Sequence, residues 1–134
     1  MGGLVTIEQE DVLRRSYEAF NARDLDAALA TMHPDVDWPD MLGGRRILGR
    51  DAVRAYWLEQ FEVIDPHVEP LGFTTSDGGL IAAEVHQVVR TRDGEVVADS
   101  TVEHVYTLRS GLVVAMDVYL GGELASAPRT SIGP

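Results

Sequence analysis

The chain contains no cysteine and relatively few basic residues. Without cysteine it can form no disulfide, no thiolate nucleophile and no thiolate metal site, so folding depends on packing alone. Its 22 acidic side chains outnumber the 11 basic ones, and the formal net charge of -11 repels phosphate backbones and anionic lipid surfaces. We therefore expect neither a nucleic acid nor a membrane among its partners.

Long hydrophobic runs are also lacking. No stretch approaches the roughly 18 apolar residues that a membrane-spanning helix needs. The segment from Met1 to Glu8 has neither the basic region nor the long apolar run of a secretory signal. These absences favour a cytoplasmic location.

The residues that are present are typical of one globular domain. A length of 134 residues suits a single hydrophobic core, and a content of 45% hydrophobic and 25% charged residues is ordinary for a globular chain. We expect the domain to span residues 1–122. Residues 123–134 are rich in glycine, alanine, serine and proline, which predicts a flexible C-terminal tail.

Helical periodicity occupies the first half of the chain. Thr6 and Gln9 have the spacing of a capping box, and apolar residues then recur at helical intervals, which predicts a helix over residues 7–22. A second, short helix is expected over residues 25–32 and a third over residues 51–65, before a proline. Between these two, the sequence predicts only a short extended piece and an irregular loop, over residues 36–38 and 43–46.

The period then changes to that of strands. Four strands joined by short glycine turns are expected, over residues 67–75, 80–91, 95–108 and 112–120. Helices followed by long hairpins predict an α+β fold. In this fold about three N-terminal helices pack on a strongly curved antiparallel sheet and enclose a pocket.

The strand expected over residues 95–108 is apolar on both faces in places. Val102 and Tyr106 lie on one face, whereas Val97 and Val105 lie on the other. An apolar outer face indicates a subunit interface, so we expect a homodimer formed through this face of the sheet. The alternative is that a chain terminus covers it.

Three segments carry a recognisable pattern of residues. They are Tyr17–Asp26, Met32–Trp38 and Gly49–Val53. Together they resemble the opening of the SnoaL-like polyketide cyclases and ketosteroid isomerases of the nuclear transport factor 2-like superfamily, and the resemblance covers about residues 8–122. It implies the α+β fold described above, in the cone-shaped form of this superfamily. It marks the activity less sharply, since the superfamily includes isomerases, cyclases, dehydratases, epoxide hydrolases and non-catalytic binders.

The resemblance to ketosteroid isomerase implies two catalytic carboxyl groups. Asp40 falls on the aspartate that shuttles the proton, although a shift of the alignment would put Asp37 there. Glu103 falls on the protonated aspartic acid of the oxyanion hole. Asp40 would then abstract a proton beside a carbonyl, while a neutral Glu103 donates a hydrogen bond to the enolate oxygen. Ser16 stands where the isomerase has a further tyrosine, with Tyr17 adjacent, so this hydrogen-bonding network is incomplete.

The resemblance to the cyclases implies a third candidate, Asp117, which lies close to Tyr119 in the last strand. The resemblance to the isomerase implies that Met116 and Val118 face inward, and strand alternation then places Asp117 and Tyr119 outside, which speaks against this role. A carboxyl on the solvent side is likewise the alternative for Asp40 and for Glu103.

The remaining predicted site residues are mainly aromatic or apolar and would contact a hydrophobic ligand. They are Tyr17, Phe20, Trp38, Trp57, Phe61, His86, Val105, Met116 and Val118. For His86 the alternative is a structural histidine, and the aromatic residues could belong to the core. No two histidines have the spacing of a metal-ligand pair, and no motif of a phosphate or dinucleotide site is present, so we expect no metal and no cofactor.

These residues predict a cofactor-independent acid–base enzyme that acts on a small hydrophobic carbonyl compound. An isomerase, a cyclase and a dehydratase working through an enolate would all fit. The alternative is a non-catalytic protein that binds a small hydrophobic metabolite, which the serine at position 16 favours. A third possibility is a structural role through the outer face of the sheet.

Overall fold

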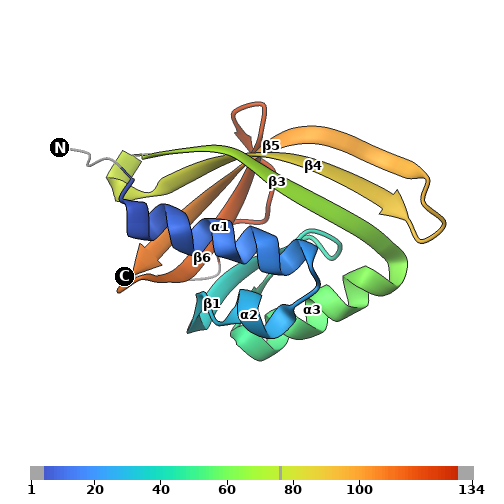
Figure 1. Ribbon diagram of the computed structural model, residues 1–134, viewed down its shortest axis with the longest axis horizontal. Coiled ribbons are helices and arrows are strands. Elements are labelled where there is room, and N and C mark those ends of the chain that lie inside the picture. Colours follow the sequence, from blue (N-terminus) through green and yellow to red (C-terminus); the bar gives the residue numbers. More distant parts are fainter. Residues whose placement is uncertain (1–4, 76, 130–134) are drawn as a thin grey trace.

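The computed structural model describes residues 5–75 and 77–129, and its elements follow the order helices first, then strands (Figure 1). The helices are α1 (Ile7–Asn21), α2 (Leu25–Leu29) and α3 (Arg50–Val63). The strands are β1 (Met32–Asp40), β2 (Arg45–Leu48), β3 (Ile64–Thr75), β4 (Ile81–Thr91), β5 (Val96–Arg109), β6 (Leu112–Leu120) and β7 (Glu123–Leu124).

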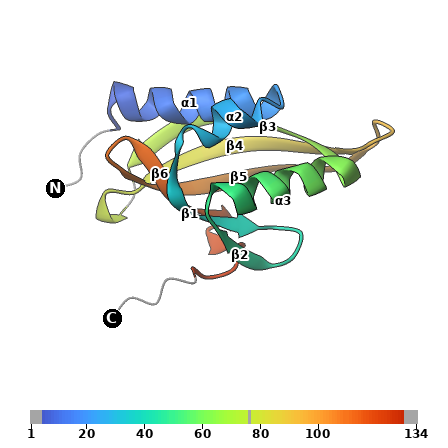
Figure 2. The ribbon, with the colours of Figure 1, turned by 90° about the horizontal axis from the view of Figure 1, so that it is seen from below.

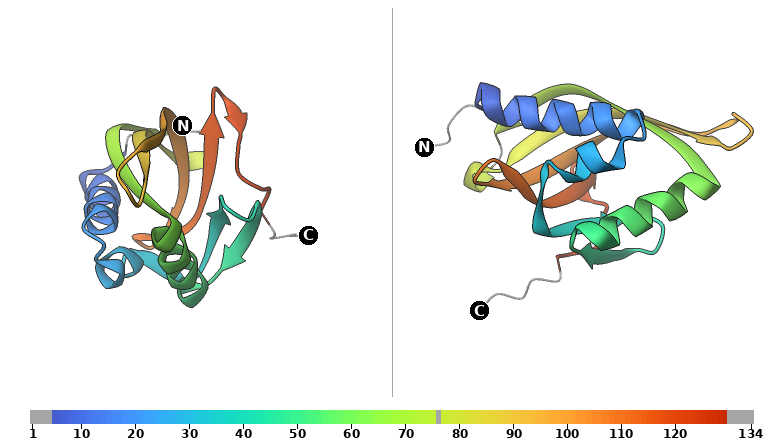
Figure 3. Two further views of the ribbon diagram at one scale, coloured as in Figure 1. Left: turned by 90° about the vertical axis from the view of Figure 1, so that its right-hand side faces the viewer. Right: turned by 60° about the horizontal axis from the view of Figure 1, so that its bottom comes forward.

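The strands form one curved sheet in the order β2-β1-β6-β5-β4-β3, with β7 paired to β6. Neighbouring strands are antiparallel except for β1 and β6, which run parallel. The three helices lie on one face of this sheet, as Figure 2 shows, and the sheet bends around them without closing (Figure 3). The predicted α+β class, with about three helices on a strongly curved sheet, is therefore confirmed.

Local signals place the first helix. The backbone N–H of Gln9 donates to the Thr6 hydroxyl at 3.1 Å, and the Thr6 N–H donates to the Gln9 side chain at 3.0 Å. This reciprocal capping satisfies two N–H groups that have no partner within the helix. The predicted helix over residues 7–22 agrees with α1 to within one residue, whereas α2 ends at Leu29, three residues earlier than predicted.

The prediction of an irregular loop at residues 43–46 is wrong for its second half, because Arg45–Leu48 forms β2. The cause is a set of long-range contacts of Arg46, whose side chain is 1% exposed. Its guanidinium donates to Asp37 of β1 at 2.8 Å and to Asp117 of β6 at 3.0 Å. These partners hold β2 against β1, which is accordingly nine residues long instead of the short piece expected at 36–38.

Pro66 lies inside β3 and does not mark its start. α3 ends at Val63, and β3 begins directly at Ile64, three residues before the predicted strand. β3 is the last strand of the sheet order, and a proline can occupy such an edge because its missing N–H need not pair with a neighbour.

Part of the expected C-terminal tail lies against the sheet. β7 pairs with β6, and the backbone N–H of Val118 donates to the Ser126 hydroxyl at 3.0 Å. The Arg129 guanidinium donates to Asp117 at 2.7 Å and to the Thr107 hydroxyl at 3.0 Å. Residues 130–134 of the expected tail lie outside the described residues.

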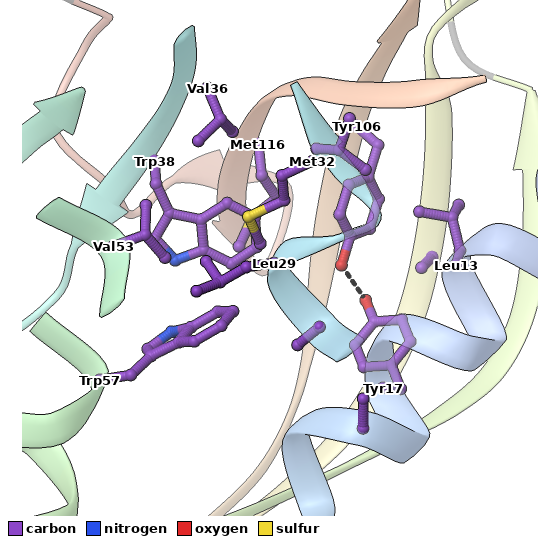
Figure 4. Packing of buried hydrophobic residues seen from close by; sticks show 14 of the residues in the cluster. Leu13, Tyr17, Leu29, Met32, Val36, Trp38, Val53, Trp57, Tyr106 and Met116 are labelled. Atoms are coloured by element: carbon purple, nitrogen blue, oxygen red, sulfur yellow. Dashed lines mark hydrogen bonds between the residues drawn. The ribbon is translucent and has the colours of Figure 1, made fainter. Parts of the chain in front are cut away.

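The core lies between the helices and the inner face of the sheet (Figure 4). Leu13 of α1, Met32 and Val36 of β1 and Val53 of α3 are completely buried there. Within residues 5–75 and 77–129, no helix is both long and apolar enough to cross a membrane.

Candidate ligand-binding site

A cavity of about 320 Å³ opens between α1, α3 and the inner face of the sheet. Its aromatic and apolar lining comes from every layer of the fold. These residues are Tyr17, Phe20, Trp38, Pro39, Met41, Leu42, Tyr56, Trp57, Ile64, Pro66, Val68, Val89, Val102, Tyr106, Met116, Val118, Leu120 and Ala125. Ser16, Gln60, Gln87, Ser100 and His104 add polar groups. This volume is at the lower end of the range usual for small-molecule sites.

Three aromatic rings form one wall of the cavity. Trp57 of α3 packs edge-on against Trp38 of β1, with 5.7 Å between ring centroids, and against Phe20 of α1 at 5.3 Å. Figure 4 shows the two tryptophans next to each other. Such edge-to-face contacts hold the rings in fixed orientations, so this wall presents a stable apolar surface to a ligand.

A chain of three hydrogen-bonded side chains crosses from β5 to α1. The Tyr106 hydroxyl donates to the Tyr17 hydroxyl at 2.7 Å, and the Tyr17 hydroxyl lies 2.7 Å from Nδ1 of His104 (Figure 4 shows the tyrosine pair). His104 and Tyr106 are two residues apart on β5 and therefore share a face of the sheet. The Tyr17 and His104 rings also stack, with centroids 5.8 Å apart.

Burial keeps all three groups uncharged. It lowers the pKa of His104 from 6.5 to about 4 and raises the pKa of Tyr106. The pKa of Tyr17 is raised well above 10.0, first by burial and then by the neighbouring Tyr106. At neutral pH the site thus holds two protonated phenols and a neutral imidazole.

The two hydrogen bonds of Tyr17 are consistent with one tautomer of a neutral His104. Since Tyr106 donates to Tyr17, the proton of Tyr17 is free to go to Nδ1 of His104, and a neutral ring then carries its own proton on Nε2. No residue of the described part of the chain takes that proton. His104 lines the cavity, so Nε2–H is the donor available to a ligand oxygen.

Tyr56 lines both the cavity and a second hollow. Its hydroxyl accepts the Met41 N–H at 3.1 Å and the Gln60 side-chain N–H at 3.2 Å. Burial raises the pKa of Tyr56 to about 12, so this phenol also stays protonated.

Of the residues predicted for ligand contact, the cavity brings together six: Tyr17, Phe20, Trp38, Trp57, Met116 and Val118. Phe61 is not among the lining residues and packs behind Phe20, with centroids 5.4 Å apart. Val105 points to the other face of β5, because its neighbours His104 and Tyr106 face inward. His86 also lies on the outer side, where Nε2 is 2.7 Å from Asp99.

Asp40 is buried, but its carboxylate is engaged by the turn that follows β1. One oxygen accepts the backbone N–H groups of Leu42 at 3.0 Å and Gly43 at 2.6 Å, and the other accepts from Arg45 at 3.1 Å. Asp40 lines the second hollow and not the cavity. Its alternative, Asp37, is bound to Arg46.

The other two predicted carboxyls also lie outside the cavity lining. Glu103 is exposed and lies opposite Glu84 on β4 and Tyr119 on β6. Asp117 is buried, and it accepts hydrogen bonds from both Arg46 and Arg129. The structure therefore does not bring the three predicted catalytic carboxyls together.

Sequence reasoning missed the polar residues of the cavity, above all His104. The signal was present in the alternation of β5, because a residue two positions from Val102 and from Tyr106 has to share their face. The resemblance to ketosteroid isomerase implied a role for Glu103, which is adjacent to His104 in sequence and faces the other side of the sheet. Ser100, two residues before Val102, shares this alternation signal. Tyr56 and Gln87 lie on α3 and β4, and folding brings them to the cavity wall.

Among the side chains that the structure describes, no three histidine, aspartate or glutamate residues form a group that could hold a metal ion. The site consists instead of apolar walls and uncharged hydrogen-bonding groups.

The model of the SnoaL-like domain family matches residues 13–116, which is more than half of the chain. The chain belongs to the SnoaL-like domain family. No curated protein matches this SnoaL-like chain significantly.

Solved structures share the SnoaL-like fold over most of its length. An NTF2-like protein of unknown function from Burkholderia pseudomallei K96243 is 27% identical with a TM-score of 0.75, covering 87% of this chain and 93% of the other. TerC, co-crystallised with polyporic acid, is 24% identical with a TM-score of 0.72, covering 83% and 89%. A Mycobacterium tuberculosis protein in complex with estradiol-17beta-hemisuccinate is 20% identical with a TM-score of 0.71, covering 85% and 94%. The family predicted from the sequence pattern is thereby confirmed.

Proposed function

We propose that this SnoaL-like protein binds a small, uncharged, hydrophobic molecule whose oxygen atom meets Nε2 of His104. The observation that carries the proposal is the cavity of about 320 Å³, with an aromatic wall on one side and the His104–Tyr17–Tyr106 chain on the other. An apolar pocket with a few converging polar groups is the usual form of a small-molecule site.

The charge of the lining supports an uncharged ligand. None of the described lining residues is an aspartate, glutamate or arginine. With the pKa of His104 lowered to about 4, the histidine brings no positive charge at neutral pH. A carboxylate or ammonium group entering the cavity would lose its hydration without gaining an opposite charge, which is costly.

The comparisons support the binding of a small molecule, though not its lack of charge, since two proteins with this fold were crystallised with polyporic acid and with estradiol-17beta-hemisuccinate. For this chain, binding can be tested with 4-hydroxystilbene, a neutral probe with one oxygen, and with 4-carboxystilbene, its charged counterpart. Trp38 and Trp57 line the cavity and report binding through their fluorescence. We expect the phenol to bind and the carboxylate to bind at least tenfold more weakly.

A His104→Asn variant tests the proposed contact. Asparagine retains an acceptor near the position of Nδ1 for Tyr17 and removes the nitrogen at Nε2. Loss of one hydrogen bond in an apolar site predicts about a tenfold weaker affinity for 4-hydroxystilbene, since a bond of this kind contributes about 1 kcal/mol or more. His86→Asn on the outer face is the matched control and should leave the affinity unchanged. Equal affinity of the carboxylate, or an unchanged affinity in His104→Asn, would contradict the proposal.

A second candidate is enolate chemistry on a bound ketone. It is supported by the hydrogen-bonded chain behind His104, because a neutral imidazole N–H would be a suitable donor to an enolate oxygen. Proton abstraction would fall to Asp40 as the family resemblance implies, after its turn has released the carboxylate. Deuterium exchange at the carbon beside the carbonyl of 4-acetylstilbene measures this step. We expect the wild type to catalyse this exchange and Asp40→Asn to lose it while still binding the ketone. If the wild type binds the ketone without catalysing exchange, enolate chemistry is refuted and only the binding function remains.

A further inference from the structure

The cavity has a second polar cluster far from His104. Gln87 of β4 and Ser100 of β5 lie directly opposite each other in the sheet register, and both line the cavity. Both are half-buried, and neither side chain donates to or accepts from any residue in the described ranges. Gln60 lines the cavity from α3. Its side-chain N–H donates to the Tyr56 hydroxyl, so its side-chain carbonyl oxygen can accept a hydrogen bond from a ligand.

The two polar clusters lie on the same face of β5, well separated along the strand. Ser100 and His104 are four residues apart, so their Cα atoms lie about 13 Å apart at the usual rise per residue. Val102 stands between them on that face, and Val89 and Phe20 add further apolar lining. The cavity therefore has polar groups at two places with an apolar stretch between them.

We propose that the cavity selects an elongated, uncharged and mainly apolar molecule with an oxygen at each end, one meeting His104 and the other meeting Gln87 and Ser100. This rests on the proposed binding function and adds the class of ligand. The two oxygens would be on the order of 10 Å apart, matching the spacing along β5. An amide and a hydroxyl each both donate and accept, so the second cluster suits a hydroxyl or a carbonyl group.

The second cluster also explains why a ligand with a single oxygen should bind less well. In the empty cavity, water can satisfy Gln87 and Ser100. A ligand whose far end is apolar would displace that water and leave the amide and the hydroxyl without partners, and such unsatisfied groups are costly. A ligand with a second oxygen replaces the lost hydrogen bonds.

The test compares 4,4′-dihydroxystilbene, which has an oxygen at both ends, with 4-hydroxystilbene by titration calorimetry. We expect the wild-type protein to bind the dihydroxy compound at least tenfold more tightly. In the double variant Gln87→Met/Ser100→Ala the ratio of the two affinities should fall to about twofold or less. Thr101→Val, next to Ser100 on the outward face, is the control and should retain the full difference. Unfolding temperatures establish that each variant is folded.

The outcomes separate this inference from the proposed function. If both compounds bind equally well to the wild type, or if the double variant keeps the full preference, the two-ended ligand is refuted while binding as such stands. If the wild type binds neither compound, the proposed function fails, and the two-ended ligand fails with it. A loss of 4-hydroxystilbene affinity in the double variant equal to its loss of dihydroxystilbene affinity would also refute the inference, because the second cluster would then act on the cavity as a whole.

Discussion

The neutral state of His104 predicts how the stability of the protein depends on pH. In the folded protein burial lowers its pKa to about 4, whereas an unfolded chain has the ordinary value of 6.5. The unfolded state therefore binds a proton first as the pH falls. The resulting stability is fully present above pH 6.5 and is lost between pH 6.5 and about 4, without further loss below.

The size of the effect follows from the two pKa values. One pH unit between them corresponds to about 1.4 kcal/mol, so the total loss from this group is about 3 kcal/mol at low pH. At pH 5 the loss relative to neutral pH is about 2 kcal/mol. Tyr17 and Tyr106, which contact the ring, stay protonated throughout this range because burial raises their pKa values.

Urea unfolding of the wild type and of His104→Gln at pH 7, 6 and 5 isolates this contribution from that of other groups. Glutamine does not titrate, so the free energy of unfolding of the wild type should fall by about 2 kcal/mol more than that of the variant between pH 7 and 5. His86→Gln on the outer face serves as the control for a histidine that is not buried. Parallel pH profiles for wild type and His104→Gln would refute the assignment of a buried, neutral histidine.

Three further predictions concern other parts of the molecule. Arg46→Met should lower the free energy of unfolding by about 3–5 kcal/mol in chemical denaturation, because it leaves Asp37 buried without its cation and Asp117 with Arg129 alone; a loss below about 1 kcal/mol would mean that the ion pairs are not desolvated. Thr6→Ala removes the cap of α1 and should cost about 1 kcal/mol, with Thr6→Ser as the control that retains the hydroxyl. Light scattering should give twice the chain mass of 14.6 kDa if the homodimer expected from the sequence forms, and Tyr119→Asp on the outer face should shift it to a monomer; a wild-type monomer would contradict the dimer.

The boundaries of the elements show where local reasoning succeeded. α1 begins at the predicted cap because its signal, the Thr6 and Gln9 pair, lies within a single turn. β6 has the predicted bounds of residues 112–120, since both period and flanking glycines are visible in the sequence. β2 was not predicted because it depends on the contact between Arg46 and Asp117. These residues are 71 positions apart, so no local sequence pattern indicates the contact.

The candidate site likewise has features that follow from local sequence and features that depend on long-range contacts. The sequence by itself determined the fold class, the family and the three aromatic rings of the cavity wall, because periodicity and capping act between near neighbours and leave a readable pattern. Only the tertiary structure decided which groups face the cavity and in what state. Tyr17 and His104 are 87 residues apart and meet through the curvature of the sheet. Asp40 and Asp117 are instead held by arginines, since buried carboxylates need such partners.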